Sequence, residues 1–374
     1  MSKPTSDCRA TERNHPWPMV RLGDVCEVLD SRRVPISKKD RVGGNVPYYG
    51  ATGVVDYVND FIFDERLVLL GEDGAKWGAG DKSAFVIEGK SWVNNHVHVL
   101  RPKLALVDSF LVWYLNYADL GEYITGVTVP KLNQQRMGQI ALPLPPLSEQ
   151  KEIVARLERE LAAVEKMKKG FEALAETAKA EFKAELKEVF EELKSGAVEM
   201  RRLGDVCELK AGGDKPTTFS KCATDTMRIP VVSNGIQNDG ICGYTDVATD
   251  HAGCVTVSAR GTIGWSCIRD YSFVPIVRLI VIRPKDNVDV GYLLRMLQQL
   301  SFNQSGSSIP QLTVPMLKGV EIPLPSLPVQ RQIVDRLSAA KARAEKLEAK
   351  AQEGVAVCET MRKAILKEAF DSGR

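Results

Sequence analysis

The sequence has no long apolar run and no hydrophobic leader. None of its 374 residues belongs to a stretch that approaches the roughly 20 apolar residues of a membrane-spanning helix. Residues 1–19 are polar and contain three prolines, without the apolar core of a signal peptide. These absences predict a cytoplasmic protein with no membrane partner and a loose tail at residues 1–19.

Cysteine pairs and surplus charge are missing too. The eight cysteines are scattered, and no two have the spacing Cys-x-x-Cys, which is typical of reduced thiols rather than of a disulfide framework. The formal net charge is only +2, so charge alone does not indicate a nucleic-acid partner. The length is sufficient for more than one domain with its own core.

What the sequence does contain is an internal duplication. Residues 143–150 open a long stretch without further proline, and a similar segment occurs at 323–330, 180 residues later. Residues 183–190 return as 363–370 with the same offset of 180. A constant offset over so long a stretch indicates two copies of one structural unit.

The globular parts repeat mainly in their frames. Residues 21–27, Arg-Leu-Gly-Asp-Val-Cys-Glu, return unchanged at 202–208. Apolar runs predict strands at 61–63, 67–70, 97–102, 254–257 and 277–284, and helices near 110–117 and 292–300. The middles, roughly 30–95 and 210–275, barely align. Matching frames with different contents indicate two modules that changed independently.

Each repeat ends in a predicted long helix. Apolar residues recur there in steps of three and four, the narrow stripe of a coiled-coil seam. About 45 residues make a helix of roughly 65–70 Å, and neither helix can bury its stripe alone. We expect the two to pair antiparallel. The predicted seam includes Ile153, Leu157, Leu161, Val164, Ile333, Leu337, Leu347 and Ile365.

The charges and ends of these helices support the pairing. Residues 147–200 carry 10 basic and 13 acidic side chains, a net charge of −3, whereas residues 327–374 carry 10 and 7, a net charge of +3. Opposite charge favours contact between the helices, although each exposed pair contributes little. Ser148, with the following Glu and Gln, is expected to cap the first helix. The second copy has Pro328 at the position of Ser148, so its cap is not predicted.

The predicted fold is α+β, with two similar globular domains joined by two long helices in an antiparallel coiled coil and a pseudo-twofold internal repeat. The expected segments are a tail at 1–19, domain 1 at 20–146, the central helix at 147–200, domain 2 at 201–326 and the C-terminal helix at 327–374.

Specific segments now resemble a known family. Residues 143–157, Pro-Leu-Pro-Pro-Leu-Ser-Glu-Gln-x-x-Ile-Val-x-x-Leu, are similar to the start of the helical regions in specificity subunits of type I restriction-modification enzymes. Residues 71–74, 94–102 and 259–264 are similar to recurrent pieces of that family's target-recognition domains. The resemblance covers residues 20–374, and the second helix start departs from it with Ser326 in place of a proline.

The resemblance implies a DNA-reading subunit for host defence that has no catalytic residues of its own. In the family, each recognition domain reads one half of a bipartite, asymmetric double-stranded DNA target. The helices set the unread spacer and dock two adenine-N6 methyltransferase subunits, and restriction subunits translocate and cleave DNA. S-adenosylmethionine, ATP and Mg²⁺ would be used by those partners, with no cofactor or metal bound by this chain.

Base edges and phosphates are read by Arg, Lys, Asn, Gln and hydroxyl side chains in loops. Each such residue has an alternative as an ordinary polar loop residue. The candidate DNA-binding residues are Arg32, Arg33, Lys38, Lys39, Tyr48, Lys76, Trp77, Lys131, Lys215, Ser233, Asn234, Gln237, Arg260 and Gln311.

Two other functions fit parts of the sequence. Residues 45–48, Asn-Val-Pro-Tyr, are similar to the Asn-Pro-Pro-Tyr loop of a stand-alone adenine methyltransferase but lack one proline. Residues 78–80 are similar to a glycine-rich cofactor turn, but they neither follow a predicted strand nor open a helix. A coiled-coil adaptor with two protein-binding heads would show the same periodicity, so periodicity does not exclude it.

A metal site is not expected. His96 and His98 alternate along a predicted strand and would share a face, and Cys242, His251, Cys254 and Cys267 lie within one stretch. Their spacing matches no zinc motif. Free cysteine is common as a small apolar core residue.

Overall fold

The computed structural model describes residues 17–126, 128–300 and 311–371. It divides into two compact units, of which unit 1 holds the residues up to Gly170 and from Gly354 onward, and unit 2 holds residues 171–353. The division falls inside both long helices, α4 (Leu147–Ser195) and α8 (Leu327–Asp371). Each unit therefore combines one globular domain with part of each helix, which confirms the α+β class.

The described residues of unit 1 form two four-stranded sheets and a two-stranded one. The first sheet, in the order β2-β9-β6-β7, is antiparallel throughout, and the second, β4-β3-β8-β5, includes one parallel pair, β3 with β8. The strand β1 pairs with β10. The strands are β1 (Met19–Arg21), β2 (Cys26–Val28), β3 (Gly43–Gly50), β4 (Gly53–Val58), β5 (Phe63–Asp64), β6 (Leu67–Gly71), β7 (Ala84–Ile87), β8 (Lys90–Val93), β9 (Val97–Pro102) and β10 (Ala141–Pro143).

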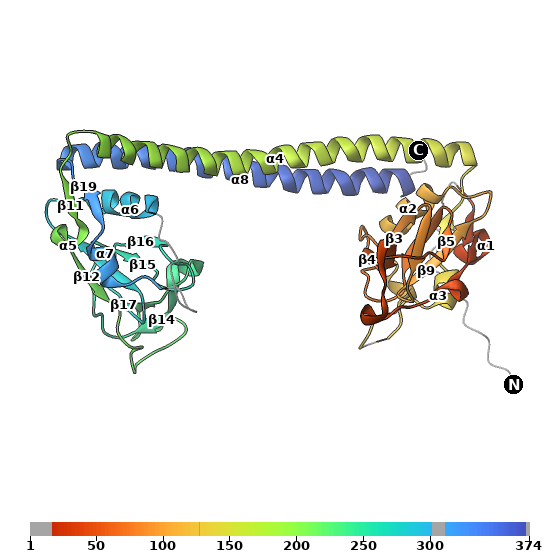
Figure 1. Ribbon diagram of the computed structural model, residues 1–374, viewed down its shortest axis with the longest axis horizontal. Helices are drawn as coiled ribbons and strands as arrows, with labels where there is room; N and C mark the ends of the chain where they lie inside the picture. Colours follow the sequence, from red (N-terminus) through yellow and green to blue (C-terminus); the bar gives the residue numbers. More distant parts are fainter. Residues whose placement is uncertain (1–16, 127, 301–310, 372–374) are drawn as a thin grey trace. The chain divides into compact units, whose positions relative to one another are not determined.

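The core of unit 1 follows from the alternation of side chains along β6. Val68 and Leu70 face a large cluster that includes Phe110 and Leu111, whereas Leu67 and Leu69 face a separate cluster on the other side of the sheet. Both faces of β6 are therefore covered, which explains its unbroken apolar run. The helices are α1 (Leu22–Val25), α2 (Asp108–Tyr117), which packs on β6 and β7, and α3 (Gln134–Gly138) (Figure 1).

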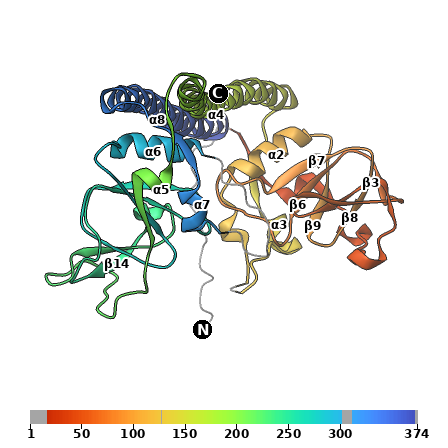
Figure 2. The same cartoon turned by 60° about the vertical axis from the view of Figure 1, so that its left-hand side comes forward.

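Unit 2 repeats this plan. Its main sheet has the order β12-β18-β15-β16, a second sheet has the order β14-β13-β17 with β13 and β17 parallel, and β11 pairs with β19. The strands are β11 (Met200–Arg202), β12 (Cys207–Ala211), β13 (Ile229–Val232), β14 (Ile241–Thr245), β15 (Cys254–Val257), β16 (Ser266–Arg269), β17 (Val274–Pro275), β18 (Ile280–Pro284) and β19 (Glu321–Pro323). The helices are α5 (Leu203–Val206), α6 (Val290–Gln299) and α7 (Val314–Lys318) (Figure 2).

The divergent middles nevertheless share a topology. In each unit a hairpin, β3–β4 or β13–β14, pairs in parallel with a later strand. The strands expected at 67–70, 97–102 and 254–257 are present, whereas only Phe63 of the run 61–63 lies in a strand and β18 begins at Ile280 rather than at residue 277. The sequence comparison missed this shared topology because loops of different length separate the strands.

Within each unit the parts of α4 and α8 run antiparallel. In unit 1, Arg156 pairs with Glu368 at 3.7 Å, and further along α4 Lys168 pairs with the earlier residue Glu359. In unit 2, Glu185 accepts hydrogen bonds from both Arg336 and Arg343. These exposed pairs fix the direction and register more than they add stability.

The predicted seam residues are all at least partly buried, but they do not form a simple two-helix seam. Ile153, Leu157 and Leu161 belong to the same core cluster as α2, and Ile333 and Leu337 belong to the core of unit 2. The ends of both helices therefore also serve as core elements of the globular domains. Val164 is buried, and Leu347 and Ile365 are half-buried.

The helix starts are held by glutamine rather than by Ser148. Because α4 begins at Leu147, Ser148 lies inside the first turn and is no cap. The fully buried Gln150 instead bridges the start of α4 to the segment before α2. Gln330 does the same for α8, which explains how the second helix begins without Ser148 or the following acidic residue.

The predicted tail lies mostly outside the described residues. Residues 1–16 are not described, while Trp17 is buried in the core of unit 1 and Met19 begins β1. In the described ranges, no helix is long and apolar enough to span a membrane.

Candidate nucleic-acid interface

In unit 1, two predicted DNA-binding residues meet at one carboxylate. Arg33 and Lys131 both contact Glu72, with Lys131 Nζ at 2.8 Å from Glu72 Oε1. Arg33 also donates to the carbonyl oxygens of Asp30 and Val97, and its side chain is 14% exposed. Arg33 thus links segments inside the domain, whereas the Lys131 side chain is 45% exposed and accessible to solvent.

His98 occupies the centre of the same cluster. Its Nδ1 lies 2.6 Å from Asp30 Oδ2 and its Nε2 lies 2.7 Å from the carbonyl oxygen of Leu132. Among the described residues, Asp30, Glu72 and His98 form the one group of three side chains close enough to share a metal ion. Both ring nitrogens are already hydrogen-bonded and two cations bind Glu72, so this group is an ion-pair network and does not suit a metal.

The electrostatics of Glu72 agree with that assignment. Burial opposes its ionisation, but the hydrogen bonds from Lys131 and Arg33, together with His98, outweigh burial and hold the pKa of Glu72 below its ordinary value. The same contact with Glu72 raises the pKa of Lys131. The cluster is therefore charged and largely self-neutralised.

The other candidates of unit 1 divide into exposed and buried side chains. Lys38, Lys39 and Lys76 are exposed, and Arg32 lies over the ring of Phe63 while its guanidinium donates to the carbonyl oxygen of Ile62. These four positions remain accessible to DNA.

Tyr48 and Trp77 are core residues, contrary to the expectation that they contact DNA. Tyr48 is 1% exposed and its hydroxyl accepts from the backbone N–H of Ile36. Trp77 is 8% exposed and its indole donates to the carbonyl oxygen of Gly71. Both aromatic side chains pack in hydrophobic clusters in the interior of unit 1.

In unit 2, several predicted residues gather where strands of its two sheets end. Asn234, which follows β13, accepts a 2.8 Å hydrogen bond from the backbone N–H of Ala259, which follows β15. Ser258 Oγ accepts from the backbone N–H of Gly235. Ser233, Asn234 and Arg260 are therefore brought to one edge of the fold.

A turn in the left-handed conformation presents Gln237 at this edge. The turn Gln237–Gly240 contains Asn238 and Asp239 with φ of 48° and 51°, a conformation that Asn and Asp adopt more readily than other residues with a side chain. The fully buried Arg269 donates to the carbonyl oxygen of Asp239 at 2.7 Å, and also to Thr256 and Tyr271. Arg269 thereby fixes the turn, and this positioning residue was missed because only the fold brings it there.

Arg260 and Gln311 contact each other directly. Arg260 Nε and Nη2 lie 3.1 and 2.8 Å from Gln311 Oε1, and Arg278 Nη1 lies 2.7 Å from the same oxygen. Lys215 is exposed, and its ammonium nitrogen lies 3.4 Å from the ring centroid of Phe219. Arg278 was not predicted from the sequence.

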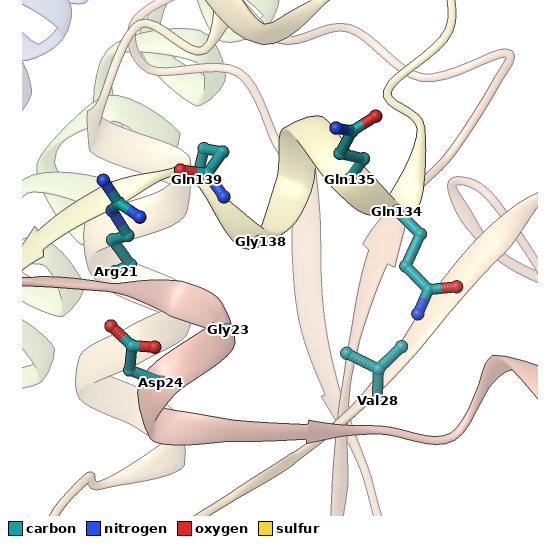
Figure 3. Close-up of a pocket in the computed structure, with 8 residues that line it drawn as sticks. All are labelled: Arg21, Gly23, Asp24, Val28, Gln134, Gln135, Gly138 and Gln139. Atoms are coloured by element: carbon teal, nitrogen blue, oxygen red, sulfur yellow. The ribbon is translucent and has the colours of Figure 1, made fainter.

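An open pocket of about 590 Å³ lies on the surface of unit 1 between α1 and α3. Figure 3 shows Gly138 of α3 opposite Gly23 of α1, with Arg21, Asp24 and Gln139 around the opening. A Cβ atom on Gly23 would lie 3.2 Å from the carbonyl oxygen of Gly138, so the glycine at position 23 allows a close contact between α1 and α3. The lining combines amides with one carboxylate and one guanidinium, and it lacks a nucleophile–base pair.

The segments similar to methyltransferase motifs, and the Cys and His residues considered as metal ligands, lie in ordinary parts of the fold. Residues 45–48 lie within β3, and residues 78–80 lie in the connection from β6 to β7 with no helix after them. Cys254 is buried, which raises the pKa of its thiol, while Cys242 is exposed. In the described ranges Cys242, His251, Cys254 and Cys267 are not close enough together to share a metal ion.

The chain thus has two α+β domains with one shared topology, and each domain is joined to parts of both long helices. The polar clusters at the edges of the two domains differ. These features define a duplicated recognition protein. The model of the family described as type I restriction modification DNA specificity domain matches residues 14–171 and 196–355, and the chain belongs to that family.

Individual relatives agree with this assignment. A putative type I specificity subunit of Mycoplasma pneumoniae is 26% identical over 332 residues, which cover 85% of this chain and 87% of the relative. The EcoDI specificity subunit of Escherichia coli is 24% identical over an alignment of 405 positions, which covers 95% of this chain and 88% of the relative. The solved HsdS subunit of Thermoanaerobacter tengcongensis has the same fold, with a TM-score of 0.59 and 20% identity over 96% of this chain and 97% of that one.

Proposed function

We propose that each domain reads one half of a bipartite, asymmetric DNA target, and that α4 and α8 set the unread spacer and dock two adenine-N6 methyltransferase subunits. The chain itself is not catalytic in this proposal. S-adenosylmethionine, ATP and Mg²⁺ are used by the methyltransferase and by restriction subunits that translocate and cleave DNA.

The observation that carries this proposal is one fold with two different polar edges. Both units place loops from the ends of equivalent strands together, yet Glu72 and Asp73 of unit 1 correspond to Ala259 and Arg260 of unit 2. Protein–DNA specificity arises from such donor and acceptor patterns against base edges. Two different patterns on one frame support two different half-sites.

A domain exchange tests independent reading. Replacing residues 20–146 by the corresponding domain of a relative should change one half of the methylated motif and leave the other half unchanged, because each unit has its own core. The motif is measured by sequencing methylated adenines in DNA from cells that express the complete complex. Exchange of residues 201–326 is the matched control and should change the other half. A change in both halves after either exchange would contradict independent domains.

An insertion in both helices tests the role of α4 and α8 as a spacer. Seven residues continuing the apolar stripe, added after Gly170 and before Gly354, extend each helix by about 10 Å. The unread spacer should lengthen by about three base pairs at ~3.4 Å each. Seven residues inserted at 196–199, after α4, are the control and should leave the spacer unchanged. An unaltered spacer in the helix variant would reduce the helices to a tether.

A further inference from the structure

Two arginines of unit 2 converge on one neutral acceptor. Arg260 follows β15 and Arg278 precedes β18, and both guanidinium groups donate to Oε1 of Gln311. In the described part of unit 2, no carboxylate lies within ion-pair distance of either group. Two like charges are therefore held together by an amide dipole alone, an arrangement that favours an oxygen-rich ligand from outside.

Their remaining donors are accessible. Arg278 and Gln311 are exposed and Arg260 is half-buried. Arg260 engages Gln311 through Nε and Nη2, and Arg278 through Nη1, so each planar group retains further N–H donors. Because both guanidinium groups are hydrogen-bonded to one amide oxygen, the rotamers of the two arginines are restricted before any ligand binds. This restriction lowers the entropy cost of binding.

The same place in unit 1 has a different charge pattern. The backbone N–H of Leu132 donates to the carbonyl oxygen of Glu72, and that of Leu312 donates to the carbonyl oxygen of Ala259. These matching hydrogen bonds make Lys131 and Gln311 equivalent.

The strand registers extend the match. Leu70 pairs with His98 and Val257 pairs with Ile280, so Asp73 corresponds to Arg260 and His96 to Arg278. The aspartate, histidine and lysine of unit 1 are thus replaced by arginine, arginine and glutamine. Since Asp73 and His96 contact each other, unit 1 neutralises this place internally and unit 2 does not.

We propose that Arg260 and Arg278, held by Gln311, contact DNA as the main donor site of unit 2. This inference rests on the proposed function. The acceptors are either phosphate oxygens or the O6 and N7 atoms of guanine, which offer the same bidentate chemistry to a guanidinium. Asn234, bonded to the backbone of Ala259, and the turn fixed by Arg269 lie next to this site along the same edge.

The test uses the chain assembled with its methyltransferase subunits. After the methylated motif of the wild-type complex is established, binding to that target and to a scrambled target is measured with R260Q, R278Q and the double variant. Each variant should bind the target about 5- to 150-fold more weakly if it loses a bidentate guanine contact, with the scrambled target nearly unaffected. If the contacts are to phosphate, both targets weaken together and the salt dependence falls by about one unit per arginine.

Controls separate the possible failures. R228Q removes an exposed arginine of unit 2 that pairs only locally with Asp225, and it should bind like wild type. R260K and R278K keep the charge, so they should retain phosphate contacts and lose guanine reading. Wild-type affinity in the double variant overturns the inference while the proposed function stands. A wild-type complex with no sequence preference overturns the proposed function and this inference together.

Discussion

Replacing Phe370 by alanine is expected to destabilise unit 1 by about 3–5 kcal/mol. Phe370 lies in the last turns of α8 and is 1% exposed. Its ring centroid lies 5.6, 5.5 and 5.2 Å from those of Phe110, Tyr114 and Tyr117 on α2. Alanine would leave a cavity between α8 and α2 and remove these aromatic contacts.

Hydrogen exchange shows where the loss falls. Amides of α2 should exchange faster in F370A, while those of α6 in unit 2 should be unchanged. The equivalent variant F190A should do the reverse, because Phe190 is buried against Tyr292 of α6 with ring centroids 5.7 Å apart. M361A, which truncates a side chain of α8 that is 40% exposed, is the control and should change stability by less than about 0.5 kcal/mol. Faster exchange in α6 of F370A would refute the assignment of this helix end to unit 1.

Replacing Gln150 by leucine should cost about 2–4 kcal/mol, because it removes three hydrogen bonds at about 0.5–1.5 kcal/mol each and leaves the buried carbonyl group of Pro145 without a partner. Gln150 Oε1 accepts from the N–H of Val107 at 2.8 Å, and Nε2 donates to the carbonyl oxygens of Ala105 and Pro145 at 2.9 and 2.8 Å. The side chain is fully buried. Leucine fits the volume but provides none of these bonds.

Unit 2 provides the matched variant. Gln330 makes the same three bonds, to Asp289, Asn287 and Pro325, so Q330L should loosen α6 as Q150L loosens α2. Both are measured by amide exchange and by thermal unfolding. The control is Gln332→Leu, an exposed position two residues further along α8.

A charged variant sharpens this test. In Q150E a carboxylate would face two carbonyl oxygens, so its folded pKa should rise above the ordinary value of about 4.3. The stability of Q150E relative to wild type should then be greatest below about pH 4 and should fall as pH rises through the folded pKa. A Q150E variant as stable as wild type at pH 7 would show that the hydrogen bonds of Gln150 do not hold the start of α4.

The repeated frame was predictable because its signals are local. The stripe of apolar residues in α4 and α8 depends only on helical periodicity, and the repeated residues at 21–27 and 143–150 mark equivalent strands and helix starts. The strand runs at 67–70 and 254–257 were found for the same reason. Seam residues such as Leu157 and Leu337 followed from the same periodicity.

The roles of individual polar residues were not predictable in this way. Tyr48 and Trp77 have side chains suited to DNA contact, but both are buried in the hydrophobic core. Arg33 forms an ion pair with Glu72. Gln150, expected to be one of several capping residues, is hydrogen-bonded to the segment before α2 and so connects the long helix to its domain.

The sequence by itself determined that this protein is a duplicated α+β chain with two long helices, because duplication and amphipathic periodicity are written in neighbouring residues. Only the tertiary structure decided which polar residues meet. Arg260, Arg278 and Gln311 are brought together by the order of strands in a sheet, as are Asp73, His96 and Lys131. Such contacts depend on long-range strand pairing, and no local pattern of residues specifies them.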